Sequence, residues 1–154
     1  MKSDRPIQFI TVKGVYSSQT NMIEAERVVE YLEKLWTPKA NPRPSAGVVT
    51  FNRKQADLIE DLLDEERRKD PGLEPFFSDA LLEPVFVKNL ESVQGDERDI
   101  MYFSITYGPD ISGAVSMNFG PLNRDGGERR LNVAVTRARQ ELRIFSSLRG
   151  EQMD

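Results

Sequence analysis

The chain has 154 residues, of which 38% are hydrophobic and 30% are charged, and its formal net charge is -4. These values indicate one globular domain with a buried core, and they exclude a disordered or fibrous chain. The negative charge excludes a protein that coats nucleic acid through bulk positive charge, so any contact with a polyanion has to be local. The sequence has no cysteine and no histidine, which removes thiolate nucleophiles, the commonest general base and the commonest metal ligands. We therefore expect no metal site in this chain.

No apolar run approaches the roughly 20 residues of a membrane-spanning helix. The first residues also lack the apolar core of a signal peptide. We therefore expect a cytoplasmic protein without membrane contact.

Extended apolar runs alternate with segments of helical periodicity, which predicts an α/β domain with a mainly parallel sheet. The first extended run spans 7–12. Asn21 then stands three residues before Glu24, the spacing of a capping box, and apolar residues recur at helical spacing as far as Trp36. The stretch 37–46 contains three prolines and is predicted to be a connecting loop.

A short buried strand is predicted over 47–51, and Asn52 can cap the helix that follows. Pro71 and Gly72 end this helix, whose apolar stripe consists of Ala56, Ile59, Leu62 and Leu63. The connection over 107–127 has no clear periodicity, and long loops of this kind are often functional. Further strands are predicted over 84–88, 100–106 and 141–146.

Four arginines and one apolar face lie within residues 129–139. As a helix, this tract would place Arg130 and Arg137 on one face and Arg139 nearly opposite to Arg137. Planar guanidinium groups suit phosphate oxygens. Alternatively, the arginines are solvated or paired with carboxylates, and the tract alone leaves both interpretations open. The apolar stripe would consist of Leu131, Val135 and Ala138, and the candidate carboxylates are those of Glu97, Asp99, Glu128 and Glu141.

A second candidate segment, 48–55, ends a predicted strand in Thr50, Asn52 and two cations. Hydroxyl, amide and charge together can bind a phosphodiester. For Asn52 and Gln55, however, helix capping is the simpler interpretation.

The third candidate segment, 92–99, precedes the strand predicted over 100–106 and contains Ser92, Gly95 and Glu97. Gly95 permits a close approach of the backbone to a ligand, and Glu97 can accept a hydrogen bond from a ribose hydroxyl or an arginine. The alternative is a polar turn that enters a strand. All three segments are predicted to lie at strand ends, where open parallel sheets place their ligand sites.

In this order, three motifs resemble motifs IV, V and VI of superfamily 1 helicases, and the closest likeness is to the Upf-like branch. They are Gly47-Val-Val-Thr-Phe-Asn-x-x-Gln55, Ser92-Val-Gln-Gly-Asp-Glu-Arg-Asp99 and Arg129-Arg-Leu-Asn-Val-Ala-Val-Thr-Arg-Ala-Arg139. The resemblance implies that residues 1–154 form the second of two RecA-like domains, a three-layer α/β sandwich of the P-loop NTPase type. It also implies that ATP binds in a cleft between this domain and the first.

The resemblance implies a role for each matched residue. Arg137 would be the arginine finger that reaches the γ-phosphate of ATP, and Arg130 would be a weaker candidate for the nucleotide site. Gly95 and Glu97 would border the nucleotide. Thr50, Asn52 and Ser92 would contact the backbone of single-stranded DNA or RNA, whereas Arg139 would be structural.

The sequence contains no Gly-x-x-x-x-Gly-Lys-Ser/Thr loop and no suitable Asp-Glu pair after a predicted strand. These parts, together with Mg²⁺, belong to the first domain of the family, so we expect the chain alone to be inactive. Two other hypotheses stay open. One is a non-catalytic RecA-like docking module, in which Arg137 is buried in an ion pair. The other is an unrelated stand-alone α/β protein.

Overall fold

A computed structural model describes residues 7–37, 44–78, 80–93, 95–110, 112 and 137–147. Strands and helices alternate over most of this part of the chain, as the hydropathy pattern predicts. The elements are, in order, β1 (Ile7–Thr11), α1 (Met22–Trp36), β2 (Ala46–Thr50), α2 (Arg53–Lys69), the 3-10 helix η1 (Pro71–Phe77), β3 (Phe86–Asn89), β4 (Arg98–Ser104) and β5 (Ala138–Ser146).

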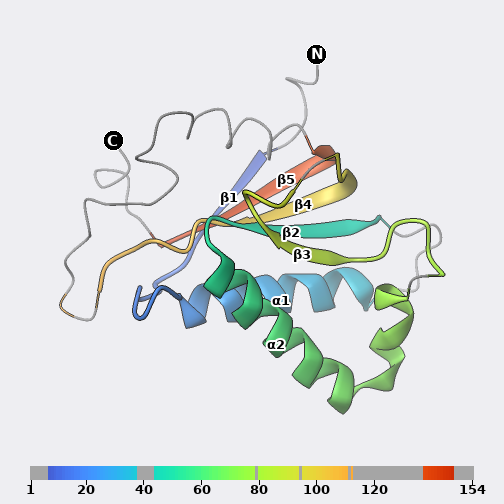
Figure 1. The fold of residues 1–154 in the computed structure, drawn as a ribbon, viewed down its shortest axis with the longest axis horizontal. Helices are drawn as coiled ribbons and strands as arrows, with labels where there is room; N and C mark the ends of the chain where they lie inside the picture. Colours follow the sequence, from blue (N-terminus) through green and yellow to red (C-terminus); the bar gives the residue numbers. More distant parts are fainter. Residues whose placement is uncertain are drawn as a thin grey trace.

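The five described strands form one sheet in the order β1-β5-β4-β2-β3, and every neighbouring pair is parallel (Figure 1). The predicted α/β class, with a RecA-like parallel sheet, is therefore confirmed. Because the strands are parallel, their carboxyl ends lie along one edge of the sheet, here called the carboxyl edge, and their amino ends lie along the opposite amino edge. The connection after β2 leads to β3 and the one after β4 leads the other way to β5, so the strand order changes direction between β2 and β4.

Both long helices begin where the sequence predicts, because an asparagine caps each of them. The side chain of Asn21 accepts a hydrogen bond from the backbone N–H of Glu24 at 3.1 Å, and that of Asn52 accepts one from Gln55 at 2.8 Å. These bonds satisfy N–H groups that have no partner within the helix. The two helices pack against the same face of the sheet (Figure 1).

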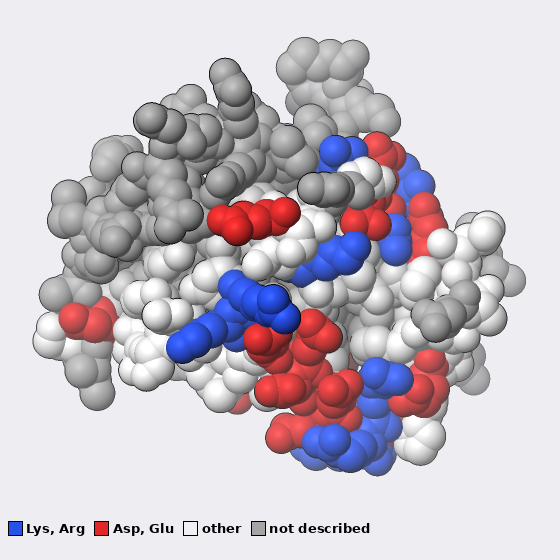
Figure 2. All heavy atoms as spheres, viewed as in Figure 1, with Lys and Arg blue, Asp and Glu red and all other residues white. Residues whose placement is uncertain are grey.

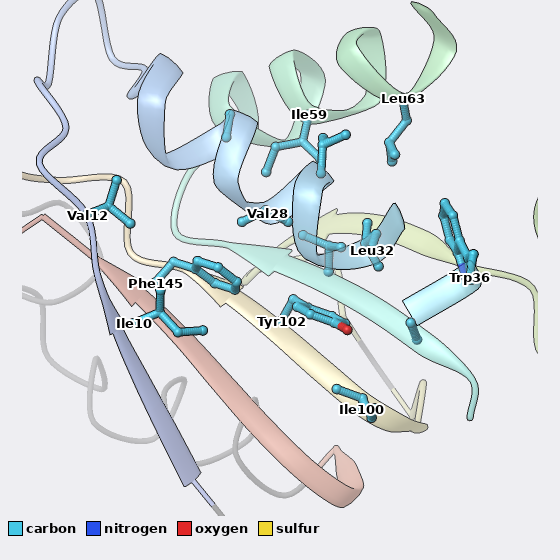
Figure 3. Packing of buried hydrophobic residues seen from close by; sticks show 14 of the residues in the cluster. Ile10, Val12, Val28, Leu32, Trp36, Ile59, Leu63, Ile100, Tyr102 and Phe145 are labelled. Carbon is cyan, nitrogen blue, oxygen red and sulfur yellow. The ribbon is translucent and has the colours of Figure 1, made fainter. Parts of the chain in front are cut away.

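An apolar cluster lies between the helices and the sheet (Figure 3). Val28, Leu32 and Ile59 point from the helices toward Tyr102 and Phe145 on the central strands. The opposite face of the sheet carries a second buried cluster, which includes Val49, Phe51, Met101, Phe103, Leu142 and Ile144. Apolar residues on both faces are what a sheet in a three-layer α/β sandwich requires.

The ends of β1 to β4 lie within two residues of the predicted bounds, and two differences from the sequence prediction are larger. Strand β5 begins at Ala138, so Ala138 and Arg139 belong to a strand and not to the predicted arginine helix. Pairing of Ala138 with Arg98 of β4 selects the extended conformation there. The second difference is η1: Pro71 ends α2 as predicted, but it also begins a 3-10 helix, with Asp70 as its N-cap.

Candidate functional site

Glu97 and Arg137 meet at the amino edge of the sheet, immediately before β4 and β5. Arg137 Nη1 lies 3.9 Å from Glu97 Oε2, and the two side chains are 26% and 46% exposed. A backbone hydrogen bond of 3.1 Å from Arg98 N–H to the carbonyl of Arg137 joins the two segments. The structure thus brings together two residues that lie 40 positions apart in the sequence and that were predicted to share a site.

The environment of Arg137 leaves its guanidinium incompletely satisfied. Its Nε is buried and has no hydrogen-bond partner among the described residues. An ion pair of 3.9 Å with a half-exposed carboxylate contributes at most about 1 kcal/mol. As far as the described residues show, Arg137 is therefore neither free in solvent nor fixed in a buried salt bridge, and a stronger acceptor can replace Glu97 at small cost.

Gly95 lies two residues before Glu97 and adopts a φ of +71°. This left-handed conformation is strained for residues with a side chain, and a Cβ at Gly95 would meet nothing within 4 Å. The glycine is therefore required by the turn itself, and space remains beside its backbone for another group.

Arg139 has a different environment from Arg137, although the two are close in sequence. Its guanidinium makes a bidentate contact with Glu83, with Nη1 at 2.8 Å from Oε2, and its Nε donates to Asp99 at 3.2 Å. The Oγ of Ser45 lies 3.2 Å from Nη2 and donates to Glu83 at 2.9 Å. We call these four residues, Ser45, Glu83, Asp99 and Arg139, the Arg139 clamp. Within this cluster, Arg139 lowers the pKa of Glu83 below its ordinary value.

The sequence left open whether the arginines of residues 129–139 are paired with carboxylates, and the structure describes the contacts of Arg137 and Arg139. Arg139 is paired, as the alternative interpretation holds, with Asp99 and with Glu83, which the sequence did not single out. Arg137 is paired loosely with Glu97, at 3.9 Å, within the described part of the chain. Arg130 and the rest of residues 129–136 lie outside the described residues.

The predicted nucleic-acid residues Thr50, Asn52 and Ser92 lie together at the carboxyl edge. Thr50 ends β2 and pairs with Asn89, the last residue of β3, and Ser92 follows in the next turn. Thr50 is fully buried, and its hydroxyl donates to the carbonyl of Asn52. This hydroxyl shapes the turn before α2 and is not exposed to a ligand, whereas Ser92 is exposed and Asn52 is half-buried.

A tight turn packs against Asn52. Ser18 and Gln19 adopt φ values of 54° and 67°, and Ser17 and Thr20 exchange two backbone hydrogen bonds across them. Two consecutive positive φ values are characteristic of a type I′ turn, which is strained without glycine or asparagine. Asn52 Nδ2 donates to the carbonyl of Gln19 at 3.0 Å, so the cap of α2 also fixes this turn.

The charges along α2 are separated. Arg53 and Lys54 are exposed in its first turn, which contains no acidic residue. Figure 2 shows basic side chains where α2 begins, acidic side chains further along the helical layer, and basic side chains again where α2 ends. Cations at a helix N-terminus oppose the helix dipole, so this end of α2 has a positive potential that favours an anion.

A buried polar network lies at the carboxyl ends of β2 and β4, where the strand order changes direction. The carboxylate of Glu24 accepts hydrogen bonds from the Ser104 hydroxyl at 2.6 Å, the Thr106 N–H at 2.7 Å and the Ser147 hydroxyl at 3.0 Å. Gln55 donates to the Asn21 carbonyl at 3.0 Å and to Ser104 Oγ at 3.3 Å. Open parallel sheets bind ligands at this position, but here the protein's own side chains occupy it.

Burial raises the pKa of Glu24 to about 7, although its hydrogen bonds with Ser104, Thr106 and Ser147 lower it. The capping-box spacing identifies Glu24 in the sequence only as a residue at the start of a helix. A stronger signal was available, because Glu24 precedes Val28 by four residues and therefore lies on the apolar face of α1. A carboxylate on that face has to be buried and hydrogen-bonded.

One expectation about the site is wrong. The three candidate segments were predicted to share the strand ends at which parallel sheets bind ligands. Only Thr50, Asn52 and Ser92 lie at the carboxyl edge, whereas Glu97 and Arg137 precede their strands and lie at the amino edge. The candidate residues thus form two sites on opposite edges of the sheet.

In the described part of the chain, no helix combines the length and the apolar character that crossing a membrane requires.

A family model described as an AAA domain matches residues 4–149 of the chain. The chain is 41% identical over 150 residues to the uncharacterized ATP-dependent helicase MG140 of Mycoplasma genitalium, a match that covers 91% of this chain and 12% of that protein. It is 39% identical over 143 residues to the MG140 homolog of Mycoplasma pneumoniae, covering 90% of this chain and 12% of that protein. The chain thus spans about one eighth of the length of these curated relatives.

Proposed function

The chain belongs to the AAA domain family, and on that basis we propose that it is the second RecA-like domain of a superfamily 1 ATP-dependent helicase. Both relatives carry the name ATP-dependent helicase, and both are far longer than this chain. Residues 1–154 would act with a first RecA-like domain that supplies the phosphate-binding loop and the Mg²⁺ ligands. ATP would bind between the two domains.

The observation that carries this proposal is the state of Arg137. Hydrolysis of ATP needs positive charge at the oxygens of the transferred phosphoryl group. Arg137 lies at an edge of the sheet, and among the described residues its buried Nε has no hydrogen-bond partner and its ionic partner is Glu97 at 3.9 Å. Its guanidinium can therefore exchange Glu97 for a phosphate oxygen, which is a stronger acceptor.

The carboxyl edge would form part of the single-strand track. Asn52, Ser92 and the basic start of α2 would contact phosphates of DNA or RNA, while the buried Thr50 hydroxyl supports the turn that presents them. Such contacts position a strand without reading its sequence. ATP and nucleic acid would then bind at opposite edges of the sheet. Closure of the two domains around ATP could therefore move the edge that holds the nucleic acid, as a translocating enzyme requires.

The test is Arg137→Ala in the full-length protein, with Arg27→Ala as the matched control. Arg27 is an exposed arginine of α1 that pairs with Glu30 at 3.3 Å, so its loss should leave turnover unchanged. We expect Arg137→Ala to lower the nucleic-acid-stimulated ATPase rate by about 10³-fold or more while ATP binding persists. Turnover at the wild-type rate would refute the assignment and favour a docking module.

A further inference from the structure

The Arg139 clamp joins segments that are distant in the sequence at the amino edge of the sheet. Ser45 directly precedes β2, Glu83 lies in the connection before β3, Asp99 is the second residue of β4, and Arg139 is the second residue of β5. Besides its ionic contacts, the clamp contains two hydrogen bonds from backbone to side chain. Ser45 N–H donates to Asp99 Oδ2 at 3.0 Å, and Asp99 N–H donates to Ser45 Oγ at 2.9 Å. The clamp therefore fixes where β4 and β5 start relative to β2.

The clamp is adjacent to the Arg137–Glu97 pair on both chain segments. Asp99 is two residues after Glu97, and Arg139 is two residues after Arg137. The pairs differ in tightness: Arg139 Nη2 lies 3.1 Å from Asp99 Oδ1, whereas Arg137 Nη1 lies 3.9 Å from Glu97 Oε2. A well-satisfied ion pair thus lies directly beside an adjustable one.

The pairing of β4 with β5 is irregular at this point. Arg98 pairs with Ala138, but the next regular partners are Ile100 and Glu141, so the register shifts across Asp99. Such an irregularity changes the direction of the strands locally. The ionic contacts of Arg139 compensate for the lost regularity, because they tie β5 to Asp99 at the place where the hydrogen-bond ladder shifts.

We propose that Arg139 is a positioning residue for ATP hydrolysis, which sets the geometry of Arg137 through the contacts of the clamp. This inference rests on the proposed function, since it presupposes that Arg137 acts on a nucleotide. Arg139 itself is not available to a phosphate, because Glu83, Asp99 and Ser45 occupy its guanidinium. A displacement of about 1 Å in a catalytic group can reduce turnover by about 100-fold. If loss of the Arg139 contacts loosens the start of β5, the rate of ATP turnover should therefore fall.

The test uses Arg139→Gln, Arg139→Lys and Arg137→Ala, singly and as the double variant Arg137→Ala with Arg139→Gln. ATP turnover by the full-length protein is measured with saturating oligo(dT) and, separately, oligo(U). We expect Arg139→Gln to lower kcat by about 10-fold to 100-fold with the KM for ATP within about 2-fold of wild type. Arg139→Lys keeps the charge but loses the bidentate contact, so its kcat should be intermediate.

The double variant separates positioning from a general structural effect. If Arg139 acts through Arg137, then Arg139→Gln should not lower the residual rate of the Arg137→Ala protein any further. An equal fold-loss in both backgrounds would overturn the proposal, as would wild-type kcat in Arg139→Gln. Wild-type turnover in Arg137→Ala would instead refute the proposed function.

If Arg139→Gln does not fold, Glu83→Gln provides the same test with Arg139 intact. Its neutral amide removes one charge of the clamp and retains its size. A several-fold lower kcat is expected, with no further loss in the Arg137→Ala background. A kcat equal to that of wild type would overturn the proposal.

Discussion

At the scale of single residues, the function of a charged side chain depends on how many of its hydrogen-bond donors already have a partner within the protein. Arg137 and Arg139 have the same chemistry and are two positions apart. Within the part of the chain that the structure describes, Arg139 has carboxylate partners on two segments, whereas Arg137 has one weak partner. An unsatisfied donor costs free energy when it is buried, and that cost is recovered when an acceptor arrives. The motif resemblance predicts different roles for Arg137 and Arg139, and the fold shows how the contacts of the two side chains differ.

The buried carboxylate of Glu24 predicts a pH-dependent stability. Its pKa is raised from the ordinary 4.5 to about 7, so the folded protein binds more protons than the unfolded chain between these values. The contribution of Glu24 is fully present below about pH 4.5 and is lost as the pH rises through 7. The free energy of unfolding should fall by up to about 3 kcal/mol from this group.

Urea denaturation of the wild type and of Glu24→Gln at pH 5 and pH 8 measures this contribution. The glutamine does not titrate, so the variant should lose less stability than the wild type over this range. Equal losses in the two proteins would show that the Glu24 carboxylate keeps the same pKa on unfolding.

At the scale of elements, local signals predicted most of the fold. The capping asparagines, the helical periodicity and the prolines predict α1 and α2 correctly, because these signals act within a few residues. The start of β5 could not be predicted in this way: Ala138 continues the apolar periodicity of the preceding tract, and only its pairing with Arg98 makes it extended. For the same reason, Glu83 could not be identified as a partner of Arg139.

Asn52 links the stability of α2 to the proposed nucleic-acid contact. Asn52→Ala removes the cap acceptor for Gln55 N–H and should cost about 1 kcal/mol in the free energy of unfolding. Asn52→Asp retains that acceptor and suits the helix dipole but loses the bond that Asn52 donates to the Gln19 carbonyl, so it should retain part of the stability. The added negative charge should nevertheless weaken binding of single-stranded oligonucleotides at low salt.

Urea unfolding and fluorescence anisotropy with a labelled oligonucleotide check the two effects separately. An Asn52→Asp protein that binds the oligonucleotide as tightly as wild type would exclude Asn52 from the contact.

At the scale of the whole molecule, the main result is the separation of the candidate residues onto two edges of one sheet. The order of the motifs in the sequence predicts which residues belong together, and the structure confirms the proximity of Glu97 and Arg137. It does not predict which edge each group occupies, because that depends on whether a segment precedes or follows its strand. The amino edge, with the Arg139 clamp beside Arg137, is the part of this domain that would face a neighbouring ATP site.

The most direct test of the central claim compares two nucleotide complexes in the full-length protein. A catalytic arginine binds the transition state more tightly than the ground state. Arg137→Ala should therefore bind a non-hydrolysable ATP analogue about as tightly as wild type but fail to trap ADP with aluminium fluoride, a mimic of the transferred phosphoryl group. Trapping of ADP and aluminium fluoride at the wild-type level would contradict the account.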